Sequence, residues 1–383
     1  MSVKIESKFH FGGCLNGLCR GLIWTGDSIT FEVATYALCG LTSDHRRRTK
    51  KNTMKHLTIL VPENQSNLST IACIVGAYEI FKRANAYWKE SRREEMFIVE
   101  LGGVTRKEEV YHGIFSVKPD LDVDSIRKTD LIIIPSLNHD YFTQAKSNMV
   151  LVEWMTKQYK GGAEIASICS GAFMLASSGL VDGKSCSTHW AFEELFRNMF
   201  PKVNLQPEKL ITDENGIYTN GGGYSFLNLA IYLVEKYFDR QTAIYCSKVF
   251  QIELDRQSQS AFTIFTGQKM HGDEMVQQAQ LYIESQLHEK ISVEELSSQF
   301  AIGRRNFDRR FIKATGNTPL EYSQRVKIES AKKAFETTRK TINEVMYEVG
   351  YSDVKAFREV FRKITGMSPL EYRGKYNKEA SLS

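Results

Sequence analysis

Residues 307–322 and 357–372 repeat one another, and this repeat restricts the possible fold more than any other feature of the chain. The segments FDRRFIKATGNTPLEY and FREVFRKITGMSPLEY start 50 residues apart and are identical at nine of sixteen positions. Self-similarity at a fixed offset indicates a duplicated structural unit. Each copy predicts a helix that ends at a glycine, followed by a helix that begins at a proline.

A shorter amphipathic helix is predicted before each copy, in SVEELSSQFAI (292–302) and TINEVMYEVGYS (341–352). A short helix, a tight turn and a basic second helix form a helix-turn-helix motif. We therefore predict an all-α C-terminal domain with two such motifs. A helix around EYSQRVKIESAKKAFET joins them.

Positive charge is concentrated in the same region. The net charge is +5, and residues 274–383 hold 19 Lys and Arg against 15 Asp and Glu, so +4 of it lies there. The strip RRNFDRRFIK (304–313) carries five positive side chains and one negative. A basic strip on a helix is typical of phosphate binding, although charged runs also occur as ordinary solvated surface. The duplicated motif favours nucleic acid.

The duplicated unit resembles the AraC/XylS family of transcription regulators over residues 274–373. The resemblance lies in the spacing of the two repeats, in the motif TG-x-[TS]-P-LEY and in the helix RVKIESAKKAF. The resemblance implies binding to double-stranded DNA, with the second helix of each motif in the major groove and the two contacts about one turn apart. Carried over by position, it implies that the DNA-facing residues are Arg304, Arg305, Asp308 and Arg309 in the first motif, and Val354, Lys355, Arg358 and Glu359 in the second.

Inward-facing phenylalanines are expected at 307, 311, 357 and 361, because i and i+4 share one helix face. Asp353 is a plausible N-cap of the second recognition helix. Two positions depart from the family. Gly303 stands where a capping Ser is common, and Glu359 stands where Arg is common, so the second motif is expected to make less base contact or to read cytosine.

The preceding part of the chain alternates short apolar runs with helical patterns. Strands are predicted at HLTILVP, MFIVELGG, DLIIIPSL, EIASICSG and GIYTNGGG, which begin at residues 56, 96, 130, 164 and 216. Apolar strands that alternate with helices predict an α/β domain, in which a flavodoxin-like parallel sheet is covered by helices on both faces.

These patterns divide the chain into five parts. Residues 1–53 are expected to be a poorly ordered extension, residues 54–250 a sensing domain, and residues 251–273 a linker with an ordered stretch. Residues 274–373 form the DNA-binding domain and residues 374–383 a tail. Because Met54 opens the first apolar run, one interpretation of the extension is an upstream choice of start codon.

Cysteine usage and hydropathy exclude several classes of protein. The seven cysteines are irregularly spaced, form no CxxC pair and make no Cys/His cluster typical of zinc. We therefore expect reduced thiols in a cytoplasm and no metal. No stretch approaches the roughly 18–20 apolar residues of a membrane helix, and the N-terminus has no secretory pattern.

Cys169 lies between a predicted strand and a predicted helix in ASICSGAFMLASSGLVDGK (166–184). The N–H groups at a helix N-terminus favour a thiolate, and enzymes use this elbow to present a nucleophile. Catalysis would also need a base or a charge partner within hydrogen-bond reach.

The domain resembles the ThiJ/PfpI superfamily, with its glutamine-amidotransferase-like fold, over residues 55–240. The resemblance rests on ICSGAFMLASSGLVDGK, STHW (187–190) and GIYTNGGGYSFLNLAIYLVE. Its pairing with an AraC-type tail resembles the GlxA-type regulators. Hydrolytic relatives carry His after the cysteine, where this chain has Ser170. Relatives with a sensitised cysteine often carry an acid early in the first helix, where this chain has Cys73. Only His189 matches, so we predict no catalytic residue and no cofactor.

A ligand pocket is predicted at the carboxyl ends of the strands, where open α/β sheets bind ligands. Its expected lining is Cys169, Ser170, Gly171, His189, Gly221, Gly222 and Gly223. Exposed N–H groups there suit a carboxylate. The resemblance implies an amine or amino-acid derivative as effector and a homodimer formed through the α/β domain.

Three alternatives remain open at this point. Cys169 is the nucleophile of an amidase or hydratase fused to a DNA-binding domain, or a redox sensor with Cys73 as resolving thiol, or an inert cysteine in a vestigial pocket with a structurally satisfied His189.

Overall fold

The computed structural model describes residues 54–92, 94–138, 140, 147–289 and 291–377, together with four short strands nearer the N-terminus. These strands form two antiparallel pairs, β1 (Gly13–Leu15) with β2 (Leu18–Arg20) and β3 (Ile23–Thr25) with β4 (Ser28–Thr30). Residues 1–52 are a unit of their own. Apart from those strands, the predicted extension (1–53) lies outside the described residues, as does the predicted tail beyond residue 377.

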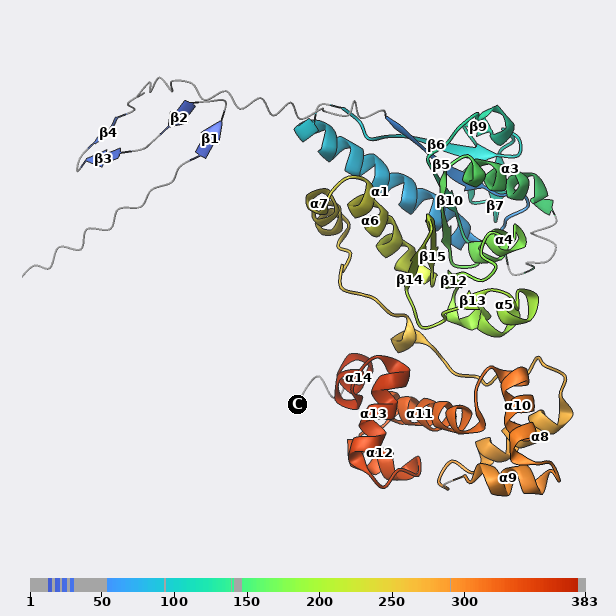
Figure 1. Ribbon diagram of the computed structural model, residues 1–383. Coiled ribbons are helices and arrows are strands. Elements are labelled where there is room, and N and C mark those ends of the chain that lie inside the picture. Colours follow the sequence, from blue (N-terminus) through green and yellow to red (C-terminus); the bar gives the residue numbers. More distant parts are fainter. Residues whose placement is uncertain are drawn as a thin grey trace, which may run out of the picture. The chain divides into compact units, whose positions relative to one another are not determined.

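The α/β domain is built on a seven-stranded sheet in the order β14–β15–β11–β10–β5–β6–β9 (Figure 1). The strands are β5 (Lys55–Val61), β6 (Phe97–Gly103), β9 (Leu121–Asp122), β10 (Leu131–Ile134), β11 (Glu164–Ile168), β14 (Ile211–Glu214) and β15 (Ile217–Asn220). All neighbours are parallel except β14 with β15. The predicted parallel sheet is confirmed, with an antiparallel edge strand that the apolar pattern did not reveal.

Helices cover both faces of this sheet (Figure 1). One face packs against α1 (Leu68–Arg92), α6 (Phe226–Tyr237) and α7 (Arg240–Phe250), and the other against α3 (Met149–Lys160), α4 (Gly171–Ser177) and α5 (Glu193–Met199). Along β10, Leu131 and Ile133 enter the first core, while Ile132 and Ile134 enter the second. Burial on both faces explains why these strands are continuous apolar runs.

Two small strand pairs lie outside the main sheet. The hairpin of β7 (Glu109–Tyr111) and β8 (Phe115–Val117) is antiparallel, whereas β12 (Ser185–Cys186) and β13 (Asn204–Leu205) pair in parallel. The sequence pattern did not predict either pair.

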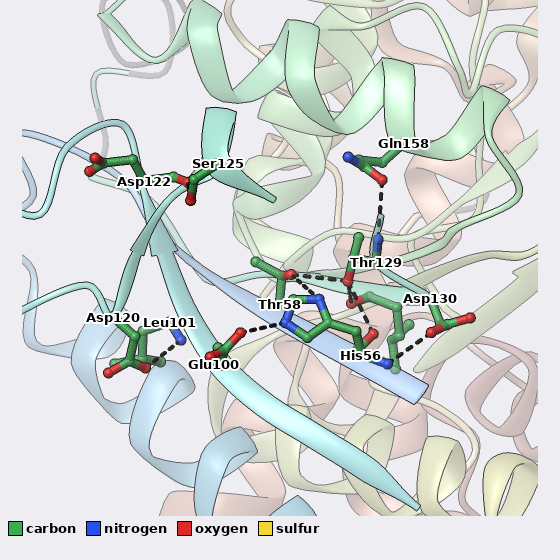
Figure 2. A network of polar contacts seen from close by, with 11 residues as sticks. His56, Thr58, Glu100, Leu101, Asp120, Asp122, Ser125, Thr129, Asp130 and Gln158 are labelled. Atoms are coloured by element: carbon green, nitrogen blue, oxygen red, sulfur yellow. Dashed lines mark hydrogen bonds and ion pairs between the residues drawn. The ribbon is translucent and has the colours of Figure 1, made fainter. Parts of the chain in front are cut away.

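A polar network ties β5 to β6, to the segment before β10 and to α3 (Figure 2). His56 Nε2 lies 2.7 Å from a carboxylate oxygen of Glu100. The Thr58 hydroxyl donates to the Thr129 hydroxyl at 3.0 Å, and Thr129 Oγ1 donates to the carbonyl of His56 at 3.0 Å. The Thr129 N–H donates to Gln158 Oε1 at 3.2 Å. Buried polar groups that are paired in this way hold the strands in register.

The C-terminal domain is entirely helical in its described residues (Figure 1). Its helices are α8 (Glu274–Ser285), α9 (Val293–Gln299), α10 (Arg304–Thr315), α11 (Pro319–Thr337), α12 (Ile342–Glu348), α13 (Val354–Thr365) and α14 (Pro369–Tyr376). The pairs α9–α10 and α12–α13 are the two predicted helix-turn-helix motifs.

The sequence repeat is also a structural repeat. Helices α10 and α13 each have 12 residues and end at left-handed glycines, Gly316 (φ 71°) and Gly366 (φ 75°). The following helices, α11 and α14, both begin with a capping box and a proline, with Thr318 and Ser368 as the N-caps. Glycine tolerates the left-handed conformation that ends each recognition helix.

Each motif has a separate hydrophobic core, and helix α11 contributes to both. The first core contains Phe307 and Phe311, and the second contains Phe357 and Phe361. All four side chains are fully buried, as the i, i+4 pattern predicted.

Residues 257–265, which we call the connecting strap, are ordered against the α/β domain in their first half. The backbone of Gln259 donates to the carbonyl of Glu208 at 3.1 Å. The Gln259 side chain is buried and donates to the carbonyl of Thr188 at 2.8 Å. The strap therefore begins as part of the α/β domain.

The second half of the connecting strap is held by the helical domain. Tyr376 donates to the carbonyl of Ala261 at 3.1 Å, and the ammonium of Lys332 donates to the carbonyl of Thr263. The N–H of Phe265 donates to Glu329 at 3.1 Å. One residue, Ser260, separates Gln259 from the first residue that bonds to the helical domain.

Candidate functional site

Cys169 occupies a sharp elbow between β11 and α4. Its φ of +56° lies in the left-handed region, which few non-glycine residues adopt. Its N–H donates to the carbonyl of Asn220 at 3.1 Å, and its carbonyl accepts from the Thr188 hydroxyl at 2.9 Å. These bonds hold the strained backbone, which presents the side chain at the carboxyl end of the sheet.

Ser170 and Gly171 hold α4 against the end of β10. The buried Ser170 hydroxyl accepts from the N–H of Leu137 at 2.8 Å and donates to its carbonyl at 3.0 Å. A Cβ on Gly171 would lie 2.6 Å from the carbonyl oxygen of Pro135. Only glycine fits there, so Gly171 is required for close packing of α4 and not for a special backbone conformation.

The three consecutive glycines after β15 have different neighbours. A Cβ on Gly221 would lie 2.6 Å from the side chain of Gln259, and one on Gly222 (φ +79°) would lie 2.5 Å from Cys169 Sγ. Gly223 lines the cavity described next. Gly221 and Gly222 therefore allow close approach of other residues of the chain, and not of a ligand.

A cavity of about 560 Å³ opens at the elbow. Its lining residues are Asn67, Leu68, Ser69, Ala72, Cys73, Ser136, Leu137, Cys169, Ser170, His189, Ala191, Phe192, Gly223, Tyr224 and Phe226. The structure thus brings four predicted pocket residues together, Cys169, Ser170, His189 and Gly223. Gly171, Gly221 and Gly222 are packed behind them.

The prediction missed two walls of this cavity. One is the start of α1 and the end of β10, which supply Asn67, Ser69 and Ser136. The other is aromatic and includes Tyr224, which is 78% exposed although it directly follows the glycines. An aromatic residue directly after a run of three glycines was the sequence signal that could have identified this wall. Hydroxyl, amide and aromatic groups together suit a small, partly apolar ligand.

The environment of Cys169 disfavours a thiolate. Burial raises the pKa of the Cys169 thiol. The groups that oppose this rise are the N–H groups of Gly223 and Ser170 and the Ser170 hydroxyl, all of them neutral. Burial also raises the pKa of the neighbouring Cys73 thiol to about 12. Contrary to the expectation from the helix N-terminus, desolvation outweighs the N–H and hydroxyl groups that bond to the thiol.

His189 is engaged in the turn that follows it. Its Nδ1 accepts from the N–H of Ala191 at 3.2 Å and caps the short turn Trp190–Phe192. Its ring also lies 5.1 Å from the ring of Trp190. This geometry orients the imidazole at the rim of the cavity.

We expect Cys169 to react slowly with iodoacetamide at pH 7, with a rate that still rises above pH 8.5, because its raised pKa leaves little thiolate at neutral pH. Peptide mass mapping after alkylation at a series of pH values measures this for each cysteine separately. A Cys169→Ser variant identifies the peptide signal. A rate that reaches its plateau below pH 7 would contradict the expectation and favour an enzyme.

On the first recognition helix, α10, the predicted DNA-facing residues differ in their ion pairing and exposure. Arg304 is ion-paired with Glu294 of α9 and lies 3.7 Å from Asp308, which is half-buried. Arg305 is exposed, and Arg309 is exposed with a 3.0 Å bond to Asn306 on its own helix. Of the predicted DNA-facing arginines, Arg305 and Arg309 therefore present their charge to solvent, whereas the charge of Arg304 is paired with Glu294.

The second recognition helix, α13, begins at the predicted N-cap, Asp353, which accepts from the N–H of Ala356 at 2.6 Å. Lys355 and Glu359 are 4.0 Å apart and 86% and 67% exposed. Arg358 is also exposed, whereas Val354 packs partly against the second core.

Two further cations, Arg362 and Lys363, are exposed later on α13. The positional comparison did not include them. Their exposure near the end of a recognition helix was readable from the same helical period that places Phe357 and Phe361 inward.

Metal and membrane sites receive no support from the part of the chain that the structure describes. No group of three or more His, Cys, Asp or Glu is placed there to hold a metal ion. Nor does any described helix combine the length and the apolar character needed to span a bilayer.

Comparison with known families matches each domain separately. Residues 86–236 match the DJ-1/PfpI family, and residues 296–375 match a helix-turn-helix domain family of the AraC type. This pair of matches confirms the predicted combination of a ThiJ/PfpI-like domain with an AraC-type helix-turn-helix domain. The elbow at Cys169 lies within the first match, and the basic helices α10 and α13 lie within the second.

Individual relatives extend over both domains. The HTH-type transcriptional regulator GbdR of Pseudomonas aeruginosa is 24% identical over 258 residues, which are 67% of this chain and 69% of GbdR. CdhR of the same organism is 22% identical over 303 residues, 78% of this chain and 87% of the relative. The crystal structure of Drosophila melanogaster DJ-1beta, 16% identical, covers 52% of this chain and 99% of its own with a TM-score of 0.44.

Proposed function

We propose that this AraC-type DJ-1/PfpI protein is a sequence-specific transcription regulator that binds double-stranded DNA through α10 and α13. The duplicated motif carries the proposal, because two equivalent helices each present exposed cations such as Arg305 and Arg358. Two recognition helices on one chain suit two adjacent major-groove contacts. The relatives GbdR and CdhR, which are named transcriptional regulators, support it.

The elbow cavity is proposed to bind a small effector, an amine or amino-acid derivative. The aromatic rings of Phe192 and Tyr224 suit a cationic group, and Ser69 and Ser136 supply hydroxyl partners. The effector would shift the population between arrangements that bind DNA and arrangements that do not. The connecting strap offers a physical route, because Gln259 bonds to Thr188, next to the cavity residue His189.

The regulator is proposed to act in the cytoplasm as a homodimer formed through the α/β domain. A dimer would place two helical domains on repeated half-sites and give four groove contacts. The number of phosphate contacts would then make binding strongly dependent on salt.

An enzyme is the alternative, and the raised pKa of Cys169 is unfavourable to it. A redox sensor has one specific observation in its favour, because Cys73 and Cys169 line the same cavity. Peptide mapping without reduction, after peroxide treatment, tests the redox-sensor alternative. Absence of both a Cys73–Cys169 disulfide and an oxidised Cys169 would eliminate the sensor.

Selection of bound sequences from random duplex DNA tests the proposed function. We expect a motif with two subsites about 10 base pairs apart, because the resemblance implies that the two recognition helices contact the major groove about one DNA turn apart. The selected DNA then serves in ligand titrations. A candidate amine should change the affinity of the wild-type protein for this DNA. It should not change the affinity of the Ala72→Trp variant, in which the tryptophan side chain would fill the cavity. A wild type that enriches no motif at moderate salt would contradict the proposal.

A further inference from the structure

Helix α11 passes from one hydrophobic core of the helical domain to the other. Tyr322 and Val326 pack in or against the first core, and Ile328 and Phe335 lie in the second. Lys327 stands between Val326 and Ile328, at the boundary. A side chain at this point can contact residues of both helix-turn-helix units.

Lys327 is buried, with 7% of the residue exposed. Its ammonium donates to the carbonyl of Glu289 at 2.9 Å. Glu289 follows α8, in the connection to α9, and so belongs to the first unit. On the other side, the ammonium lies 5.7 Å from the ring centre of Tyr351, which packs against the second core.

The two units also meet directly at this point. Gly350 lies in the turn between α12 and α13, with φ +74°. A Cβ there would lie 2.5 Å from the carbonyl oxygen of His288 and 2.7 Å from the Lys327 ammonium. The turn of the second motif therefore rests on the α8–α9 connection of the first, and Lys327 fills the corner between them.

A lysine is an unfavourable choice for this corner if stability alone matters. Burial lowers the pKa of the Lys327 ammonium, opposed by nearby Glu289, because desolvation disfavours the charged form. A methionine of similar length would avoid that cost. What the ammonium adds is a directional, charge-assisted bond to one carbonyl, which fixes a single arrangement of the parts it joins.

We propose that Lys327 is a positioning residue that fixes the separation and angle of α10 and α13, and thereby the spacing of the two DNA subsites. This inference rests on the proposed DNA-binding function. It predicts that loss of the Lys327 contact loosens the spacing requirement while each subsite keeps its own sequence.

Selection from random duplex DNA with the full-length chain tests this, comparing wild type, Lys327→Met and the control Lys333→Met, which alters an exposed lysine of the same helix. We expect one dominant subsite spacing for wild type and control. For Lys327→Met we expect the same two subsites at several spacings, and about tenfold weaker binding to the best wild-type DNA. A merely stabilising residue would lower the melting temperature without changing the spacing.

An unchanged single spacing and unchanged affinity in Lys327→Met overturn the inference but leave the proposed function intact. A wild type that selects no paired subsites overturns both. If Lys327→Met fails to fold, Gly350→Ala attacks the same corner from the second unit. The same broadening of spacing supports the inference, and a single wild-type spacing in Gly350→Ala overturns it.

Discussion

Replacing Arg305 and Arg309 together by alanine is expected to abolish sequence-specific DNA binding. Both side chains are exposed on α10, and an arginine that reads guanine contributes about 1–3 kcal/mol of discrimination. The pair is therefore worth roughly 2–6 kcal/mol, or about 30-fold to more than 10⁴-fold in affinity for the selected DNA. Fluorescence anisotropy with selected and scrambled duplexes measures the loss.

A charge-matched control distinguishes base reading from simple attraction to phosphate. The double variant Arg310→Ala, Lys313→Ala removes the same charge from α10, but Arg310 is bound to Asp273 at the start of α8. We expect this control to weaken binding to both duplexes alike and to lower the salt dependence, while keeping the preference for the selected sequence. Equal loss of preference in both variants would count against base reading by Arg305 and Arg309.

Replacing Phe361 by alanine is expected to destabilise the second helix-turn-helix unit by about 3–5 kcal/mol. Phe361 is fully buried, and its ring meets those of Phe335 and Tyr372 edge-on at 5.7 and 5.5 Å. Removal of the ring leaves a cavity that rigid neighbours fill only in part. Three of the four tryptophans, Trp88, Trp154 and Trp190, lie in the α/β domain and none lies in the helical domain. Tryptophan fluorescence therefore follows chiefly the α/β domain, whereas circular dichroism also follows the helical one.

The expected result is a circular dichroism transition at lower denaturant, with the tryptophan transition nearly unchanged. Ile312→Ala is the matched control, because Ile312 is 42% exposed on the equivalent helix α10. It should change stability by about 0.5 kcal/mol or less, as surface substitutions usually do. Equal effects of the two substitutions would show that the second core does not depend on Phe361.

The fold was largely predictable where local chemistry repeats. The 50-residue repeat placed both motifs, and the apolar runs placed every central strand of the sheet. β14 was missed because its sequence, ITDE, has little apolar character, as fits an edge strand of which only one residue is buried. β12 and β13 were missed because two-residue strands carry no period at all.

Only the wall of the cavity that the Cys169 elbow forms was predicted from the sequence. The sequence located Cys169 and the glycines, because a strand, a turn and a helix with small residues form a local pattern. A glycine indicates that something approaches closely, but not what approaches. At Gly171 it is the carbonyl of Pro135, and at Gly221 it is Gln259. Gln259 itself was invisible, because a glutamine in a polar segment resembles any solvated linker.

The connecting strap determines where this chain can be cut and rejoined. Gln259 is buried in the α/β domain, and Phe265 packs against the first helical core and lies edge-on to Tyr322. A hybrid protein that borrows only residues 54–250 would leave Gly221 facing an empty slot and the carbonyl of Thr188 without its donor. Residues 257–265 bond to both domains, so a hybrid built from this chain should keep this segment together with the parts of both domains that hold it.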